Sequence, residues 1–243
     1  MPNLTIEQHL LTPNPYSRPS LPLRAVHKIV IHWVANPGTS ALVNRNYFEN
    51  LKHGTRNIYA SSHYIVGLFG EILQCIPDTE LAYHAKNANT YSLGIEVCHL
   101  DWEGAFSTET YNALINLVVH LCHKYTLDPQ KDILRHYDVT GKVCPKYYVH
   151  HPAYWTKLKE DVVTCYTKTY LGLPTSTYPH AIQDPSATYQ PTSIRLKLNG
   201  IVKNVSAFTV NDCHYVRLRD LADNTLCITF DPLLGLPCLS VKQ

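Results

Sequence analysis

The stretch KIVIHWVA, residues 28–35, consists mainly of apolar and β-branched residues, the profile of a central strand buried on both faces. It carries His32 among these apolar side chains. The turn NPGTS follows, and its Thr39 or Ser40 can cap a helix, which the next residues predict over 41–53. A buried strand that leads into a helix indicates a domain of the α/β type.

Further strands and helices follow in irregular alternation. HYIVGLF and EILQCIP, on either side of Gly70, resemble the two strands of a hairpin, and SLGIEVCHL, residues 92–100, is a further strand that carries Glu96. Apolar residues at helical spacing predict a helix over 107–125. DILRHYDV supplies a short strand that runs into a loop, and a closing helix is expected over 151–168. This order predicts an α/β fold, a mixed central β-sheet flanked by helices.

Changes in proline content and in apolar patterning divide the chain into three parts. Residues 1–168 hold the α/β domain, and the first 25 residues, with five prolines, are expected to form an extended arm on its surface. Residues 169–191 are rich in proline and have little periodic apolar content, as in a linker. Residues 192–243 alternate as strands do, with turn signals at NG and ND and a short helical piece near LRDLAD. They predict a small α+β domain.

The composition is that of a globular protein, with 45% hydrophobic and 16% charged residues. A net charge of +2 gives no field that would attract nucleic acid. No apolar run approaches the roughly 20 residues that a membrane-spanning helix needs. The N-terminus lacks a basic start followed by an apolar core, so it is not the pattern of a secretory signal. We therefore expect the eight cysteines to be reduced thiols made in a cytoplasm, with any export through another protein's pore.

The segment RHYDVTGKVCP, residues 135–145, holds metal-binding side chains around a glycine turn. Zinc catalysis needs about three protein ligands and one open position for water. His32 from the central strand, with His136 and Cys144, can supply such a set if strand and segment adjoin. Lys142 would then lie beside the metal, where its ammonium could stabilise an oxyanion. The alternative is an accident of composition, because a histidine in a buried strand is usually a hydrogen-bonded core residue.

A zinc hydrolase also needs a base that takes a proton from water. Glu96 is the best candidate, because its apolar neighbours would raise its proton affinity toward the working range. The alternative is a carboxylate that faces outward from its strand. Only the five residues taken together, His32, Glu96, His136, Lys142 and Cys144, favour the catalytic interpretation.

Four segments, IVIHWVA, SSHYIVG, AYHAKNANTYSLGIEVC and RHYDVTGKVCP, occur in this order and spacing. Together they resemble the zinc-dependent N-acetylmuramoyl-L-alanine amidases, a fold shared with the peptidoglycan recognition proteins and the lysozyme-type amidases of bacteriophages. The resemblance covers residues 24–165. It implies zinc held by His32, His136 and Cys144. It also implies cleavage of the amide between the lactyl group of N-acetylmuramic acid and L-alanine in bacterial peptidoglycan.

The resemblance assigns further roles to single residues. Lys142 matches a lysine that helps catalysis two residues before the last ligand, and Glu96 matches a glutamate in a GIE strand. Some members use a tyrosine where this chain has Ser62, so that role does not carry over. His84 matches a histidine beside the cleft, which either binds substrate or holds a loop. His63 is expected to orient the site from behind the ligands.

The C-terminal segment from LKLNG to LRDLAD resembles the small domain at the amino end of copper amine oxidases, which also occurs in cell-surface proteins of Gram-positive bacteria. YVRLRDLA echoes that family's strand-to-helix junction, with Arg217 at a proline position. The resemblance implies an accessory module and no copper chemistry. Anchoring to the cell wall and a dimerisation or spacer role stay open, and so does the oligomeric state.

These observations lead to one expected function and its rivals. We expect a zinc peptidoglycan amidase of the bacteriophage or prophage endolysin type, made in the host cytoplasm and released to the cell wall by a holin or by lysis. A host autolysin with the same activity is an alternative. A further alternative, from another class, is a peptidoglycan-binding recognition protein without catalysis. A purely structural zinc ranks last, because such sites use four ligands and the sequence offers no fourth at matching spacing.

Overall fold

The computed structural model describes residues 4–54 and 57–171 in full and, beyond these, the backbone of five strands. The chain divides into two compact units, Met1–Ser176 and Thr177–Gln243. The first unit contains every candidate site residue, so its architecture determines the chemistry.

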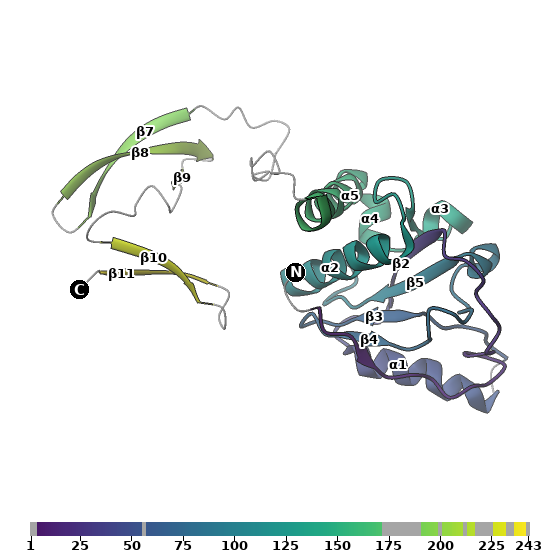
Figure 1. The fold of residues 1–243 in the computed structure, drawn as a ribbon. Helices are drawn as coiled ribbons and strands as arrows, with labels where there is room; N and C mark the ends of the chain where they lie inside the picture. Colours follow the sequence, from purple (N-terminus) through teal and green to yellow (C-terminus); the bar gives the residue numbers. More distant parts are fainter. Residues whose placement is uncertain are drawn as a thin grey trace. The chain divides into compact units, whose positions relative to one another are not determined.

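One six-stranded mixed sheet forms the centre of the first unit, in the order β1-β4-β3-β5-β2-β6 (Figure 1). The strands are β1 (Glu7–Gln8), β2 (Lys28–Trp33), β3 (Tyr64–Val66), β4 (Ile72–Gln74), β5 (Ser92–Val97) and β6 (Ile133–Arg135). β2 runs parallel to both β5 and β6, β3 runs parallel to β5, and β3 and β4 form an antiparallel pair. The predicted mixed sheet and hairpin are therefore confirmed.

Strand β2 is a central strand because both of its faces are covered. Ile29 and Ile31 lie in the main core with β5 and α2, whereas Val30 packs on the other face against the loop that holds Ala85 and Ala88. Each of these side chains is fully buried, which explains the uninterrupted apolar run in the sequence. His32 follows Val30 on that second face, by the alternation of a strand.

Helices cover both faces of the sheet. They are α1 (Ala41–Asn50), extended by η1 (Leu51–His53), α2 (Thr108–Tyr125), and α5 (Pro152–Tyr166), extended by η3 (Thr167–Leu171). α2 and α5 pack on the face that carries the main core, and α1 packs on the other (Figure 1). Ser40 and Ser107 cap α1 and α2, as a hydroxyl before an apolar run predicts. A short helical turn, η2 (Lys86–Thr90), lies in the loop before β5.

The segment after β6 differs from its prediction as a loop. It begins at once with a helix, α3 (His136–Thr140), and a second short helix, α4 (Lys146–His150), follows. The Asp138 carboxylate accepts a hydrogen bond from the backbone N–H of Arg135 at 2.8 Å and pairs with the Arg135 guanidinium, which stabilises the first turn of α3. Gly141 ends α3 in the left-handed region, at φ 77°.

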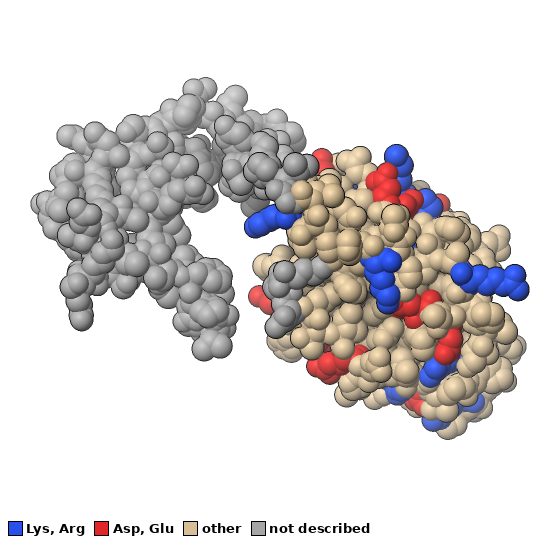
Figure 2. Space-filling model, in the orientation of Figure 1, with Lys and Arg blue, Asp and Glu red and all other residues tan. Residues whose placement is uncertain are grey.

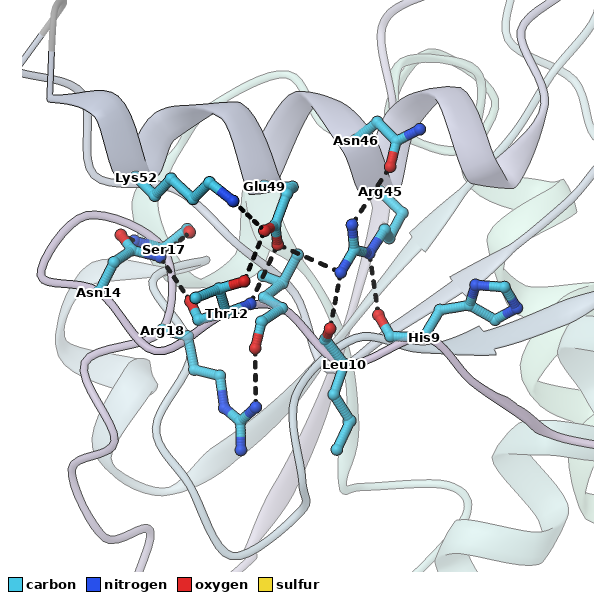
Figure 3. A network of polar contacts seen from close by, with 11 residues as sticks. His9, Leu10, Thr12, Asn14, Ser17, Arg18, Arg45, Asn46, Glu49 and Lys52 are labelled. Carbon is cyan, nitrogen blue, oxygen red and sulfur yellow. Dashed lines mark hydrogen bonds and ion pairs between the residues drawn. The ribbon is translucent and has the colours of Figure 1, made fainter.

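The N-terminal arm is joined to the domain more closely than an extended surface arm would be. β1 pairs with β4, and Leu11 is 1% exposed. Side chains of α1 hold the arm in a network that we call the arm clamp (Figure 3). In it, the Arg45 guanidinium donates to the carbonyl oxygens of His9 and Leu10, and the Glu49 carboxylate accepts from the backbone N–H and hydroxyl of Thr12.

The second unit is described only by its strands. β7 (Pro191–Leu198), β8 (Ile201–Val210) and β9 (Cys213–Val216) form an antiparallel sheet, and β10 (Leu226–Asp231) pairs with β11 (Leu236–Val241). The pairs β7–β8 and β8–β9 flank the predicted NG and ND turns. The predicted helical piece near LRDLAD and most of the predicted linker lie outside the described residues. The three domain boundaries and the resemblance to the copper amine oxidase module therefore stay predictions.

The surface of the described residues shows no gathering of one charge on the face that Figure 2 presents, where basic and acidic side chains are interspersed. Among the helices that the structure describes, none is long and apolar enough to span a bilayer.

Candidate functional site

The site lies where three parallel strands end at one edge of the sheet. His32 is next to last in β2, Glu96 is next to last in β5, and His136 directly follows β6. His32 and Glu96 are partners in the parallel register, so their side chains project from the same face. The carboxyl ends of parallel strands are where α/β folds commonly place binding sites. The sheet therefore brings together residues that are far apart in the chain.

Cys144 reaches the same edge through α3 and the turn that follows it. The backbone N–H of Tyr137 donates to the carbonyl oxygen of Cys144 at 2.9 Å, which folds the segment back on itself. Gly141 ends α3 in the left-handed conformation, which glycine adopts at the least cost, and the chain then turns back toward the sheet edge.

His32, His136 and Cys144 form a compact trio. One ligand atom from each lies within 4.8 Å of the others, and the Cys144 Sγ is 3.8 Å from the His32 Nδ1. All three side chains are buried, with His32 and Cys144 each 2% exposed. The structure thus brings together the three residues that the sequence analysis selected as metal ligands. Among the described residues the trio has no fourth donor.

The electrostatics of the trio suit a metal ion. Burial lowers the pKa of His32 well below its ordinary value, and burial with the nearby Lys142 lowers the pKa of His136 to about 4. Both imidazoles are therefore neutral at pH 7, the form that binds metal. Burial, and then the Glu96 carboxyl, raises the pKa of the Cys144 thiol to about 12. A cation bound there would displace the thiol proton.

One atom of the trio is unsatisfied in a way that fits a missing ligand. The Nδ1 atom of His136 is buried and has no hydrogen-bond partner. Buried polar atoms are almost always paired, so an unpaired ring nitrogen on a member of the trio calls for an explanation. Two imidazoles and one thiolate are a donor set that zinc takes readily. The residues present therefore fit a zinc ion.

Glu96 lies in the same small cavity. A pocket of about 210 Å³ is lined by the trio together with Glu96 and Lys142. Burial raises the pKa of Glu96 to about 8, although the ammonium of Lys142 acts in the opposite direction. The Oε2 atom of Glu96 is buried and has no partner. This carboxyl is consequently poised to exchange a proton near neutral pH.

A larger cleft of about 530 Å³ adjoins this pocket and shares five lining residues with it, namely Tyr59, Tyr83, His84, His136 and Lys142. Its other lining residues are Lys86, Asn89, Thr140 and Gly141. These four and the two tyrosines were not functional candidates on sequence grounds. The polar loop sequences NIYASS and LAYHAKNANT were the available signal, since tyrosines outside a periodic apolar pattern have no core to fill.

His84 and His63 lie behind the trio. The His84 Nδ1 is 3.1 Å from the His32 Nε2, and the Asn89 carboxamide oxygen accepts from the backbone N–H of His84. His63 is fully buried and bonded to backbone groups of Gly94 and Glu80. His84 lines the larger cleft, and its Nε2 bonds to the Ser92 carbonyl, where the loop before β5 ends, so substrate binding and holding a loop both stay predictions.

Tyr64, two residues after Ser62, does not reach the site. It is 2% exposed in the main core, and its hydroxyl donates to the Asp78 carboxylate at 2.5 Å. Tyr64 is therefore a core residue.

A mixed sheet with three buried donors at its carboxyl edge, an adjoining carboxyl group and an open cleft is typical of a metal-dependent hydrolase. The family model described as N-acetylmuramoyl-L-alanine amidase matches residues 22–147, more than half of the chain. The chain belongs to this family.

Individual relatives agree with this assignment. The chain is 37% identical over 169 residues to the N-acetylmuramoyl-L-alanine amidase BlyA of Bacillus subtilis, and 38% identical over 161 residues to the N-acetylmuramoyl-L-alanine amidase CwlL of Bacillus licheniformis. Each match covers 61% of this chain and 44% of the relative, so the chain spans less than half of either. A solved mutant endolysin from Bacillus subtilis has a similar fold, with a TM-score of 0.54 at 24% identity over 65% of this chain and 98% of that chain.

Proposed function

We propose that this protein hydrolyses the amide bond between the lactyl group of N-acetylmuramic acid and L-alanine in bacterial peptidoglycan, as a zinc enzyme. The observation that carries the proposal is the trio of His32, His136 and Cys144, three buried donors without a fourth among the described residues, in a pocket that also holds Glu96. A catalytic zinc site typically has three protein ligands, because its fourth position stays open for water. Family membership and two relatives named as amidases support the choice of substrate.

Zinc would be held by the two imidazoles and the thiolate of the trio. Bound there, it would polarise the scissile carbonyl and make a water molecule more acidic. The fit rests on the unpaired His136 Nδ1, on two imidazoles that are neutral at pH 7, and on a thiol close enough to share the ion.

Glu96 moves the proton in the proposed reaction. Its carboxylate accepts a proton from the attacking water as the new carbon–oxygen bond forms. The same proton passes to the nitrogen of L-alanine as the carbon–nitrogen bond breaks, which leaves a lactyl carboxylate and a free amino terminus. A pKa raised by burial to about 8 suits a group that must take up and release one proton near neutral pH.

Lys142 supplies a positive charge beside the pocket. It lines both the small pocket and the larger cleft, and it acts electrostatically on Glu96 and on the trio. An ammonium in this place stabilises the negative charge that develops on the carbonyl oxygen in the transition state.

The larger cleft is the proposed binding site for the peptide stem of peptidoglycan. Its lining includes two lysines, Lys86 and Lys142, and no acidic side chain. Tyr59 and Tyr83 contribute aromatic surface on the same wall, with their rings 5.8 Å apart. A cleft of this character suits an anionic chain with free carboxylates, such as the peptide stem of peptidoglycan.

The test uses the full chain, its bound metal and purified cell walls. Metal analysis should find zinc in an amount equal to the protein, and incubation with walls should release new amino termini that are identified as L-alanine. Binding to walls without release would favour the recognition-protein alternative. Release of reducing sugars in place of amino termini would replace the amide bond with a glycosidic one.

The endolysin role is a proposal of the sequence analysis, with a host autolysin as its alternative. Expression of the full chain with and without a pore-forming holin tests it, because an endolysin lyses the host cell only when the holin opens the membrane.

A further inference from the structure

Three imidazoles, those of His63, His84 and His32, form a row that ends in the candidate metal site. The ring centroids of His63 and His84 are 5.8 Å apart, and those of His84 and His32 are 5.3 Å apart, in both cases with nearly perpendicular planes. Each ring bonds to a neighbour through specific nitrogens, so the positions of the ring protons follow from the partners.

The outer nitrogen of His84 must carry a proton. The His84 Nε2 is 3.3 Å from the carbonyl oxygen of Ser92 and 3.3 Å from its hydroxyl oxygen. The carbonyl can only accept. The Ser92 hydroxyl already donates its one proton to the carbonyl oxygen of Ala88 at 2.6 Å, so its oxygen accepts as well. His84 is therefore protonated at Nε2, and as a neutral ring it has a lone pair at Nδ1.

This lone pair determines the protonation of His32. The His84 Nδ1 is 3.1 Å from the His32 Nε2, and a hydrogen bond across this distance requires His32 to donate. His32 then has its proton at Nε2 and its lone pair at Nδ1. That Nδ1 is the atom that faces the Cys144 Sγ at 3.8 Å. The lone pair thus points to the place where a cation would lie.

Strand β5 makes room for the row. A Cβ added at Gly94 would lie 2.6 Å from the Cγ of His84, so only glycine lets this ring pack against the strand. The backbone N–H of Gly94 donates to the His63 Nδ1 at 3.0 Å, and the His63 Nε2 donates to the carbonyl oxygen of Glu80 at 2.9 Å. Gly94 therefore leaves space for one imidazole and binds the next.

We propose that His84 is a positioning residue that holds His32 in the tautomer with its lone pair at Nδ1, and so prepares that nitrogen for the metal. The metal role of His32 rests on the proposed function, whereas the hydrogen bond between His84 and His32 does not. Partners that orient a metal-bound histidine are most often carboxylates, carbonyls or waters. Here a second imidazole, itself anchored to Ser92, takes that place.

A competing role for His84 is direct contact with the substrate, because its ring also lines the larger cleft. The two roles differ in what a substitution changes. A positioning residue alters zinc affinity in the absence of substrate, whereas a substrate contact alters KM and leaves zinc affinity unchanged.

The first experiment measures zinc affinity in the full chain by competition with a chromophoric chelator. His84→Phe keeps an aromatic ring and removes both nitrogens, and His84→Asn keeps an acceptor close to the position of Nδ1. His120→Phe, a similar change on α2 outside the row, is the control. We expect His84→Phe to weaken zinc binding by about 10- to 100-fold, His84→Asn to recover much of the loss and the control to be neutral. Unchanged affinity in His84→Phe overturns the proposal.

The second experiment needs no variant, so a folding defect cannot obscure it. Nitrogen-15 NMR of the metal-free full chain reads the tautomer of each imidazole. We expect His32 and His84 both to carry their protons at Nε2. A His32 proton at Nδ1 overturns the proposal. Failure of the proposed function has a different signature, namely this tautomer and tight zinc binding in a protein that releases no amino termini from cell walls.

Discussion

Two buried polar clusters in the first unit differ in one respect, whether their polar atoms have partners. The first, which we call the Asp78 cluster, surrounds a buried carboxylate that accepts from four groups, the hydroxyls of Tyr64 and Tyr125, the ammonium of Lys124 and the carboxamide of Gln74. The second is the pocket of the metal trio. There the His136 Nδ1 and the Glu96 Oε2 are buried without partners.

This difference in pairing is what we expect between a cluster that stabilises the fold and a pocket with the proposed catalytic role. Fully paired buried polar groups contribute to the stability of one packed state, whereas unpaired ones cost free energy unless a ligand completes them. Of the three buried side-chain atoms without a partner among the described residues, two lie in this pocket, and the third is the Nε2 of His99. Five predictions test this contrast, and they are ordered from the largest expected effect to the smallest.

Removal of one donor from the trio should have the largest effect. In Cys144→Ala, two imidazoles remain, and we expect zinc no longer to copurify and the release of amino termini from walls to fall to background. The unfolding temperature of the metal-free protein should change little, because alanine is also a small apolar residue. Metal analysis and thermal unfolding check both points. Cys165→Ala, the same change outside the site, is the control, and stoichiometric zinc in Cys144→Ala would contradict the assignment.

Replacing the unpaired carboxyl of Glu96, which can exchange a proton, with a carboxamide, which cannot, should abolish most catalysis and cost no stability. We expect Glu96→Gln to keep zinc and to lower turnover at least about 100-fold, the usual loss when an acid–base group is removed. The metal-free variant should be no less stable than the parent, since a neutral carboxamide replaces a carboxyl that burial disfavours when charged. Steady-state release of amino termini is the measurement, with the exposed Glu109→Gln as control. Near-normal turnover would remove Glu96 from the mechanism.

A carboxyl-to-carboxamide change in the Asp78 cluster should have the opposite result, a loss of stability without a loss of activity. We expect Asp78→Asn to lower the free energy of unfolding by about 2 kcal/mol, because charge-assisted hydrogen bonds are lost from a buried site. Zinc content and turnover of the folded enzyme should be unchanged. Urea unfolding measures the loss, and Asp128→Asn, at an exposed ion pair, should have little effect. A loss of zinc in Asp78→Asn would show that the two clusters are coupled.

The Asp78 cluster should also make stability depend on pH. Burial alone raises the pKa of Asp78, but hydrogen bonds from Lys124, Tyr125 and Tyr64 outweigh it and hold the pKa below its ordinary value. The folded state therefore binds this proton more weakly than the unfolded state. The stabilisation is complete above the unfolded-state value of about 3.9 and disappears as the pH falls through the lower folded-state value. Urea unfolding from pH 6 to pH 2.5 should show a shallower decline in Asp78→Asn than in the parent.

The arm clamp is a paired network nearer the surface, so its effect should be the smallest. Arg45→Met removes two donors to backbone carbonyls of the arm, and we expect a loss of about 1 kcal/mol. Hydrogen exchange at the Leu11 amide, which bonds to the Cys75 carbonyl, should become faster, while zinc affinity stays unchanged. Arg24→Met outside the clamp is the control. Unchanged exchange at Leu11 would mean that β1 and the buried Leu11 hold the arm without the clamp.

Much of the fold could be predicted from local patterns. The apolar run of β2, the helical spacing of α2 and the serine caps of α1 and α2 each express a preference that depends on near neighbours in the chain. The short helix α3 was missed, because its first turn depends on the pair Arg135 and Asp138 rather than on an apolar period. The closely held arm was missed for a similar reason, since its partners lie on α1.

The sequence by itself determined the donors of the site. Imidazole, thiol, carboxyl and ammonium groups have fixed chemistry, and the sequence predicted that they meet if the central strand and the segment 135–145 adjoin. Only the tertiary structure decided which of these atoms are paired. His32 meets His84 across 52 residues of chain, and their hydrogen bond depends on the strand register and on the missing side chain of Gly94. No sequence pattern reveals such contacts. They depend on how closely two separate elements pack in space, whereas a sequence pattern reports the order of residues within a single helix or strand.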